Sequence, residues 1–206
     1  MRLDLSEILA CPACGPPQGL VVLVDRLEGG RVVAGELGCP ICEARHPIAD
    51  GVACFARPPL SEGGPEAPVD PERAVRLAAL LGTAETRGVF LLGPGLSASA
   101  EGVSRLAADS EVLAVHAADV GVAGRAGITP IVVDRIDRLP VLDGRLRGAA
   151  FGGAGMPSAR EAVRILVPGG RLVVLDPPRG LDAALPDLGL ALRAVDARAL
   201  VAERRG

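Results

Sequence analysis

The stretch Gly88-Val-Phe-Leu-Leu-Gly-Pro-Gly-Leu-Ser97 joins a short apolar run to a glycine-rich turn. A continuous apolar run of this length, bounded by glycines, is typical of a strand buried on both faces of a sheet. A helix is predicted after it near residues 99–108, and a second strand over residues 111–115. Strand, glycine turn, helix and strand in this order predict the opening βαβ unit of a doubly wound parallel sheet.

The residues on either side extend this α/β pattern. Asp70 before Pro71, with Gly82 after the last apolar residue, predicts a helix with a side-chain N-cap, a proline in its first turn and a glycine beyond its end. Ser158 and Glu161 have the spacing of a capping box at the start of another helix. Further strands are predicted at residues 128–133, 146–151 and 171–175, followed by a closing hairpin at 189–195 and 199–204.

Four of the five cysteines lie in two pairs, Cys11-Pro-Ala-Cys14 and Cys39-Pro-Ile-Cys42. Two such pairs, separated by enough chain for a β-hairpin, have the spacing of a structural zinc site in which four thiolates leave no position open for a substrate. Strands predicted at residues 19–24 and 31–37 supply the hairpin. A redox site needs only one pair in a βαβ context, and disulfides need an oxidising compartment. The spacing therefore favours zinc over redox chemistry or disulfides.

Residues 57–69 are rich in Pro and Gly and show no apolar periodicity, which is typical of a linker. We therefore expect three parts: a β-rich zinc-ribbon domain (residues 1–57), a linker (58–69) and a Rossmann-like α/β domain (70–206). The short apolar stretch over residues 3–9, which leads into the first cysteine pair, is predicted to be a strand and a turn.

Charge and composition limit the possible partners. The 22 basic and 25 acidic residues give a net charge of −3, and the chain has three Phe but no Trp or Tyr on which bases could stack. Direct binding of nucleic acid is therefore not expected. The opening Met-Arg-Leu-Asp-Leu-Ser-Glu lacks the apolar core of an export signal, and no apolar run has membrane-spanning length. We expect a cytoplasmic protein that does not associate with membranes.

The residues around the cysteine pairs resemble the small zinc-ribbon proteins that act as activating partners of tRNA and release-factor methyltransferases. The resemblance covers about the first 55 residues and rests on Ile8-Leu-Ala-Cys-Pro-Ala-Cys14 and His46-Pro-Ile-Ala-Asp-Gly-Val52. The usual Tyr is His46 here, and the usual Pro is Ala53. The resemblance implies a protein partner, either a methyltransferase, which here could be the same chain, or a second ribbon through self-association. Pairing would use strand addition or apolar contact.

The second half resembles class I S-adenosylmethionine-dependent methyltransferases over about residues 71–205. The resemblance rests on the Pro168-Gly-Gly170 element before the predicted strand at 171–175, on Asp137-Arg-Leu-Pro-Val-Leu-Asp-Gly144, and on the closing hairpin. It implies a cofactor site formed by the glycine turn and by the residues after the second and third strands of the sheet.

The glycine turn departs from the pattern of these enzymes. Gly93 and Gly95 match the first two glycines of Gly-x-Gly-x-Gly, but Ser97 replaces the third. Pro94 removes one N–H donor from the turn. Leu91 stands where an acid is usual.

The two acids that would hold the ribose and the adenine amine are also displaced. The position of the ribose-binding acid corresponds to His116, with Asp119 three residues later. The position of the adenine-binding acid corresponds to Arg135, next to Asp134. The candidate cofactor-binding residues are therefore Gly93, Gly95, His116 and Asp134. Each lost charge-assisted hydrogen bond is worth about 1.5–3 kcal/mol, so losing two or three weakens cofactor binding by orders of magnitude.

Two functions remain open at this point. One is methyl transfer from S-adenosylmethionine by a domain with an eroded cofactor site. The other is a non-catalytic pseudo-methyltransferase that acts as an interaction or activator subunit of a larger assembly. No catalytic residue is identified. Cys54 is interpreted as a buried side chain because no His/Asp constellation accompanies it, and His46 as packed or exposed because four cysteines already saturate zinc.

Overall fold

The structure is a computed structural model that describes residues 1–56, 70–107, 109–116, 124–153 and 155–206. The predicted linker over residues 58–69 and Asp119 lie outside these ranges. The strands are β1 (Val21–Glu28), β2 (Arg31–Gly38), β3 (Arg45–Ala49), β4 (Val52–Cys54), β5 (Val89–Leu92), β6 (Glu111–His116), β7 (Ile128–Val132), β8 (Leu146–Gly152), β9 (Leu166–Leu175), β10 (Leu190–Val195) and β11 (Ala199–Arg204). The α-helices are α1 (Pro71–Leu81), α2 (Ala100–Leu106), α3 (Met156–Ile165) and α4 (Leu181–Ala184), and the 3-10 helices are η1 (Leu3–Glu7), η2 (Ser97–Ser99) and η3 (Pro186–Leu188).

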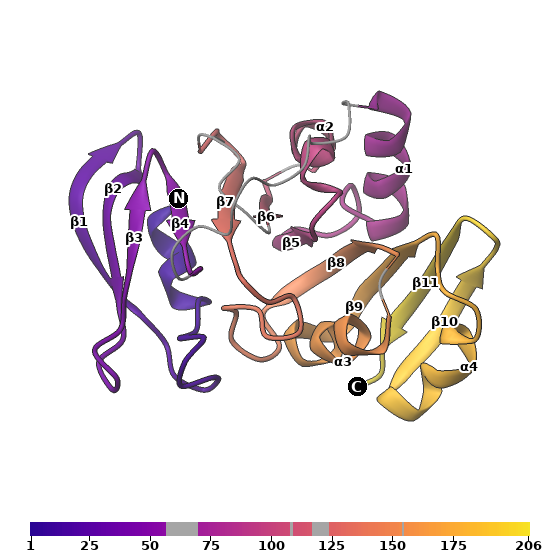
Figure 1. Cartoon of the computed structure of the whole chain (residues 1–206). Coiled ribbons are helices and arrows are strands. Elements are labelled where there is room, and N and C mark those ends of the chain that lie inside the picture. The colour runs from indigo at the N-terminus through magenta and orange to yellow at the C-terminus, as the bar shows by residue number, and fades with distance from the viewer. Residues whose placement is uncertain (57–69, 108, 117–123, 154) are drawn as a thin grey trace.

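All eleven strands belong to one sheet, in the order β1-β2-β3-β4-β7-β6-β5-β8-β9-β11-β10. From β7 to β9 the neighbouring strands are parallel, and β11 and β10 close the sheet with antiparallel pairing. Helices α1 and α2 lie on one face of this half and α3 on the other (Figure 1). The predicted parallel sheet with an antiparallel closing hairpin is therefore confirmed.

Helix α1 shows why local chemistry predicted this half well. One carboxylate oxygen of Asp70 accepts hydrogen bonds from the backbone N–H groups of Glu72 at 3.0 Å and Arg73 at 3.2 Å. Gly82 follows the helix at φ 71°, a left-handed conformation that favours glycine. The cap, the proline and the terminal glycine lie where the sequence predicts them.

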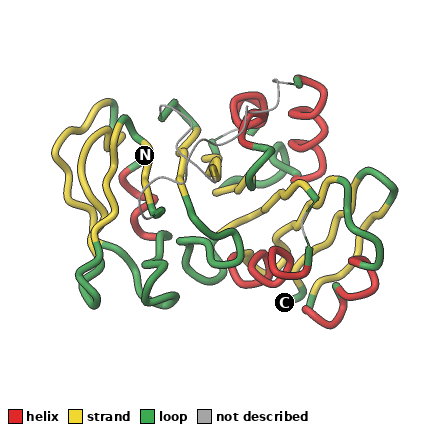
Figure 2. Tube along the Cα trace, viewed as in Figure 1, coloured by secondary structure: helices red, strands yellow, loops and turns green. Residues whose placement is uncertain are grey.

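The cysteine-rich part joins the same sheet through β4. Strands β1 to β4 pair antiparallel, and β4 then pairs parallel with β7, with Ala53 opposite Ile131 and Cys54 opposite Val132. The backbone N–H of Phe55 extends this pairing by donating to Val132 at 2.8 Å. Figure 2 shows the strands of this sheet following one another from the first part of the chain to the second.

The two parts also share a hydrophobic core. Leu5, Leu9 and Leu37 from the first part pack in one cluster with Leu113 and Ile131 from the sheet. A second cluster lies on the opposite face under α1 and α2. None of the helices within the described ranges is long and apolar enough to cross a membrane.

Two local predictions are wrong. Residues 3–7 form the 3-10 helix η1 instead of a strand, because the Ser6 hydroxyl donates to the carbonyl of Leu3 at 2.8 Å and the turn buries Leu5. Helix α3 begins at Met156 with Gly155 as its N-cap, so Ser158 and Glu161 do not form a capping box. The Glu161 carboxylate instead accepts from the backbone N–H of Leu139 at 2.6 Å, a tertiary contact that sequence spacing cannot reveal.

Gly35 in β2 occupies a position that no other residue fits. Its φ is 155°, and a Cβ there would lie 2.2 Å from the carbonyl oxygen of Leu23 in β1, where the β1–β2 pairing shifts register. We expect Gly35→Ala to reduce the free energy of unfolding by about 1–3 kcal/mol, because the strands must separate to admit the methyl group. Gly38→Ala is the matched control, since its Cβ would lie 3.9 Å from the nearest atom. Equal urea unfolding midpoints for the two variants would refute the steric argument.

Candidate functional site

The structure brings the four predicted metal ligands together. Their sulfur atoms all lie within 4.8 Å of one another, with 3.6 Å between Cys11 and Cys42 and 3.8 Å between Cys14 and Cys39. A Zn–S bond of about 2.3 Å in tetrahedral geometry requires sulfur–sulfur separations of about 3.8 Å. The Cys11–Cys42 and Cys14–Cys39 separations match this value and no other separation exceeds 4.8 Å, so the cluster has the size of a tetrahedral metal site.

The backbone of the second knuckle favours a thiolate at Cys39. Burial disfavours the Cys39 thiolate, but backbone N–H groups of Cys42 and Ile41 donate toward it and lower the pKa of Cys39 to about 7. Hydrogen bonding between sulfurs, mainly with Cys42, raises the pKa of Cys14 to about 12. Four thiolates at this spacing repel one another, so a cation is needed to hold them all deprotonated.

The residues after each knuckle adopt the left-handed conformation. Gly15 has φ 77° and Glu43 has φ 57°. Glycine tolerates this conformation freely, whereas glutamate is strained by about 1–2 kcal/mol. A Cβ at Gly15 would lie 2.8 Å from a terminal nitrogen of the Arg138 guanidinium, a flexible group that can move aside.

The first knuckle contacts the segment that follows β7. The backbone N–H of Ala10 donates to Pro140 at 3.1 Å, and that of Leu142 donates to Ile8 at 2.8 Å. The Arg138 guanidinium donates to the carbonyl of Ala13 at 3.3 Å. The cysteine cluster therefore supports residues 138–142, which lie within the stretch from Asp137 to Gly144.

The same segment is held from its other side by α3. Arg164 donates to the carbonyls of Leu139 at 3.0 Å and Val141 at 2.6 Å, and to the Glu161 carboxylate at 2.9 Å. Burial disfavours the Arg164 charge, but hydrogen bonds to Glu161 and Asp143 outweigh it and raise the pKa of Arg164.

The glycine turn follows β5 at the carboxyl end of the sheet. The backbone N–H of Gly93 donates to Ala150 at 2.8 Å, and a Cβ at Gly93 would lie 2.6 Å from the Phe151 ring. Gly93 is therefore required by packing. Gly95 has φ 81° and nothing within 4 Å of its Cβ position, so its backbone lies open.

His116 and Asp134 lie at the ends of the two neighbouring strands. His116 is the last residue of β6 and pairs with Val132 of β7, and its carbonyl accepts from Val133 at 3.0 Å. His116 is buried and Asp134 is exposed. The glycine turn, His116 and Asp134 thus lie at the carboxyl ends of β5, β6 and β7, the edge at which parallel α/β sheets bind ligands.

Arg135, at the position of the expected adenine-binding acid, is bound to Asp137. Its guanidinium donates to both carboxylate oxygens, at 3.0 and 2.7 Å. This hydrogen-bonded pair raises the pKa of Arg135 and lowers that of Asp137. Asp137 therefore cannot take the place of the missing adenine-binding acid unless its pair with Arg135 breaks.

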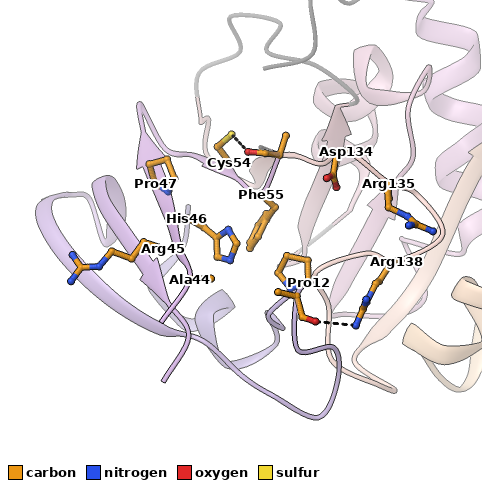
Figure 3. Close-up of a pocket in the computed structure, with 12 residues that line it drawn as sticks. Pro12, Ala44, Arg45, His46, Pro47, Cys54, Phe55, Asp134, Arg135 and Arg138 are labelled. Atoms are coloured by element: carbon orange, nitrogen blue, oxygen red, sulfur yellow. Dashed lines mark hydrogen bonds between the residues drawn. The ribbon is translucent and has the colours of Figure 1, made fainter. Parts of the chain in front are cut away.

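A cavity of about 470 Å³ lies where the cysteine-rich part meets the segment after β7. Figure 3 shows the His46 and Phe55 rings, Pro12 and the Asp134 carboxylate around this space. The ring centroids of His46 and Phe55 are 4.9 Å apart. Sequence reasoning did not find this cavity because its walls come from segments about 80 residues apart. Of the two positions that the sequence left open for His46, packed or exposed, the structure shows the packed one, against Phe55.

A comparison with known protein families matches the first part of the chain. A model of the family described as "Trm112p-like protein" matches residues 2–51. No curated protein matches the chain in a sequence search.

Solved structures with a similar fold are methyltransferases. Geranyl diphosphate C-methyltransferase from Streptomyces coelicolor A3(2), in complex with S-adenosyl-L-homocysteine, superposes with a TM-score of 0.56 and 15% identity, over 66% of this chain and 76% of that chain. A geranyl diphosphate methyltransferase in complex with SAM has a TM-score of 0.52 and 15% identity, over 66% of this chain and 85% of that chain. At this identity the likeness shows the fold alone. The predicted fold class, a β-rich ribbon followed by a class I methyltransferase-type sheet, is confirmed, and the chain joins a Trm112p-like segment to that fold.

Proposed function

We propose that the chain is an S-adenosylmethionine-binding protein of the class I methyltransferase fold that carries its own zinc ribbon and works in the cytoplasm. The observation that carries the proposal is that Gly93, Gly95, His116 and Asp134 lie at the carboxyl ends of three adjacent parallel strands. Similar folds have been solved with the methyl donor or its product bound, which supports the choice of ligand. A cytoplasmic location suits a thiolate cluster, which requires reducing conditions.

The proposed metal of the cysteine cluster is Zn²⁺, held by Cys11, Cys14, Cys39 and Cys42. The sulfur separations fit its tetrahedral radius, and the ion supplies the positive charge that keeps the four thiolates together. Its role is structural. It fixes the knuckle that contacts residues 138–142.

The ribbon uses the same chain as its partner. In this proposal β4 occupies the edge of β7 that a separate activating subunit would otherwise cover, which follows the strand addition expected for such a ribbon. The domain limits that we propose remain residues 1–57 for the ribbon and 70–206 for the α/β domain, joined by the linker 58–69.

A second candidate function, as a non-catalytic interaction subunit, is favoured by two observations. The acids at positions 91, 116 and 135 are replaced by Leu, His and Arg. The outermost strand β1 also exposes apolar side chains, with Val21 54%, Leu23 51% and Leu27 50% exposed. An exposed apolar row on an edge strand is a surface suited to a further protein partner.

Titration calorimetry with S-adenosylmethionine on the zinc-loaded protein separates the two functions. Micromolar binding supports the first function over a subunit that has lost its cofactor site. We expect His116→Asp to tighten binding by about 10- to 100-fold, because a carboxylate there restores one charge-assisted hydrogen bond to the ribose. Asp187→Asn, an exposed change far from this edge, is the control. No heat of binding at millimolar cofactor, for both the wild type and His116→Asp, would overturn cofactor binding.

A further inference from the structure

The outer edge of the sheet carries a groove that the proposed cofactor binding does not use. Strand β1 is the edge strand, and β2, β3, β4, β7 and β6 lie between it and β5, which leads into the glycine turn (Figure 1). The groove has a volume of about 330 Å³ and lies between β1 and the second knuckle. Its lining, within the described residues, includes none of the candidate cofactor-binding residues, so it is a separate surface.

Gly38 leaves a hollow in this surface. On the exposed face of the ribbon it pairs with Val21 on one side and with Arg45 on the other, so that the three residues form a row across β1, β2 and β3. Glycine has no side chain, and a Cβ at Gly38 would lie 3.9 Å from the carbonyl oxygen of Val21, its nearest neighbour. The centre of the row therefore has room for a side chain of another molecule.

The first half of β1 is an open, apolar edge. Val21 and Leu23 are about half exposed and line the groove. Edge strands are normally protected against further pairing by irregular register and by charged side chains. In β1 the register shift and the charged residues lie beyond Val24. The first half can therefore pair with an added strand, whose alternate side chains would face the groove.

Glu43 gives the groove one uncompensated negative charge. Arg45, the other charged residue of the lining, pairs with Glu36 at 3.1 Å. Among the described residues the Glu43 side chain is exposed and makes no hydrogen bond or ion pair. Its backbone is strained, with φ 57°, whereas Gly15 occupies the same position after the first knuckle. Strain of this kind is typical of residues retained for binding, and a basic side chain is the complement of this carboxylate.

We propose that the groove binds an extended segment of a partner protein, which adds as a strand to the first half of β1. The segment presents apolar, basic and apolar side chains at alternate positions. The apolar side chains cover Val21 and Leu23, and the basic side chain lies over Gly38 and pairs with Glu43. The contact is short, so the complex is weak and reversible. This inference does not depend on cofactor binding, since it holds for a methyltransferase and for a non-catalytic subunit alike.

The experiment is a fluorescence anisotropy titration of a labelled peptide, Ser-Val-Thr-Arg-Thr-Val-Ser, with the full-length zinc-loaded protein. We expect a dissociation constant below about 1 mM, and binding about fivefold or more tighter than for the same peptide with Glu in place of Arg. Hydrogen exchange over β1 should slow in the presence of the Arg peptide. Exchange over β10, the opposite edge of the sheet, should not change.

Two variants separate the parts of the site. Gly38→Val fills the hollow and should remove binding of the Arg peptide. Glu43→Gln keeps the length of the side chain but not its charge, so it should remove the preference for the Arg peptide over the Glu peptide. The matched controls are Ala194→Val, an exposed residue of β10, and Glu28→Gln, an exposed residue of β1 beyond the register shift. Both controls should bind as the wild type does, and zinc content and thermal unfolding verify that each variant is folded.

Equal affinity of the wild type for the two peptides, or binding of the Arg peptide by Gly38→Val at wild-type affinity, would overturn the proposal. So would the absence of any anisotropy change at about 1 mM protein. A dimer in sedimentation equilibrium that excludes the peptide would assign this edge to a second copy of the chain instead. Binding of S-adenosylmethionine is measured separately, so failure here leaves the proposed cofactor site unaffected.

Discussion

Replacing Cys11 and Cys14 by Ser is expected to release the metal and to destabilise the α/β half together with the ribbon. Structural zinc contributes about 10–16 kcal/mol to the folding of small zinc modules, so the ribbon does not survive its loss. The α/β half then loses the strand that covers β7 and the ribbon residues that pack on Leu113 and Ile131. We expect one cooperative unfolding transition in the zinc-loaded protein and a large fall in its midpoint in the variant.

The measurement combines zinc content per chain with thermal unfolding followed by circular dichroism. Cys54→Ser is the control, because Cys54 lies outside the cluster and its thiol is placed 3.8 Å from the carbonyl of Ala56. It should keep one zinc per chain. If the double Ser variant retains zinc, the site is wrong. If it loses zinc while the α/β half keeps its transition temperature, the shared core does not couple the two parts.

The sequence predicted those features whose chemistry is local. Helix α1 follows from a cap, a proline and a glycine within thirteen residues, and the cysteine cluster follows from two pairs whose knuckle geometry is built into each four-residue turn.

The sequence alone left the partner of the ribbon open: a separate methyltransferase, the same chain or a second ribbon. Strand β4 has three residues, and its match to β7 has no local signature. Pro130 lies in β7 and offers no N–H, and the β4 pairing is confined to the next two residues, Ile131 and Val132. Such a short overlap leaves most of the contact to side chains, which the sequence does not place.

The cavity and the start of α3 escaped prediction for the same reason. Glu161 has the spacing of a capping residue but is used to hold Leu139, 22 residues away. Phe55 and Asp134 meet only because β4 and β7 are neighbours in the sheet. A tertiary contact overrode the local capping pattern at Glu161. At the cavity, tertiary contacts brought together residues that no sequence pattern connects.

A buried ion pair between Arg31 of the ribbon and Glu111 of β6 gives the other large expected effect. The guanidinium donates to the two carboxylate oxygens at 2.8 and 3.3 Å, and to the hydroxyl of Thr129 at 3.0 Å. Glu111 is 1% exposed and also accepts from the Thr129 hydroxyl at 2.6 Å. We expect Glu111→Ala to lower the free energy of unfolding by about 3–5 kcal/mol, because the Arg31 charge is left buried without its partner.

The double variant Arg31→Met/Glu111→Leu separates two quantities: the free-energy cost of leaving one charge without its partner, and the net stability that the ion pair contributes. Replacing both charges by apolar groups of similar size is often neutral, so we expect the double variant to be more stable than either single variant in urea unfolding. The exposed pair Arg26–Glu28, at 3.2 Å, is the matched control, and removing Glu28 should cost less than about 1 kcal/mol. A loss below that value for Glu111→Ala would mean that water reaches Arg31, and the junction between ribbon and sheet would then be looser than these contacts imply. A double variant less stable than both single variants would instead mean that the pair contributes net stability. The polar contact would then hold the ribbon on the sheet together with the shared apolar core.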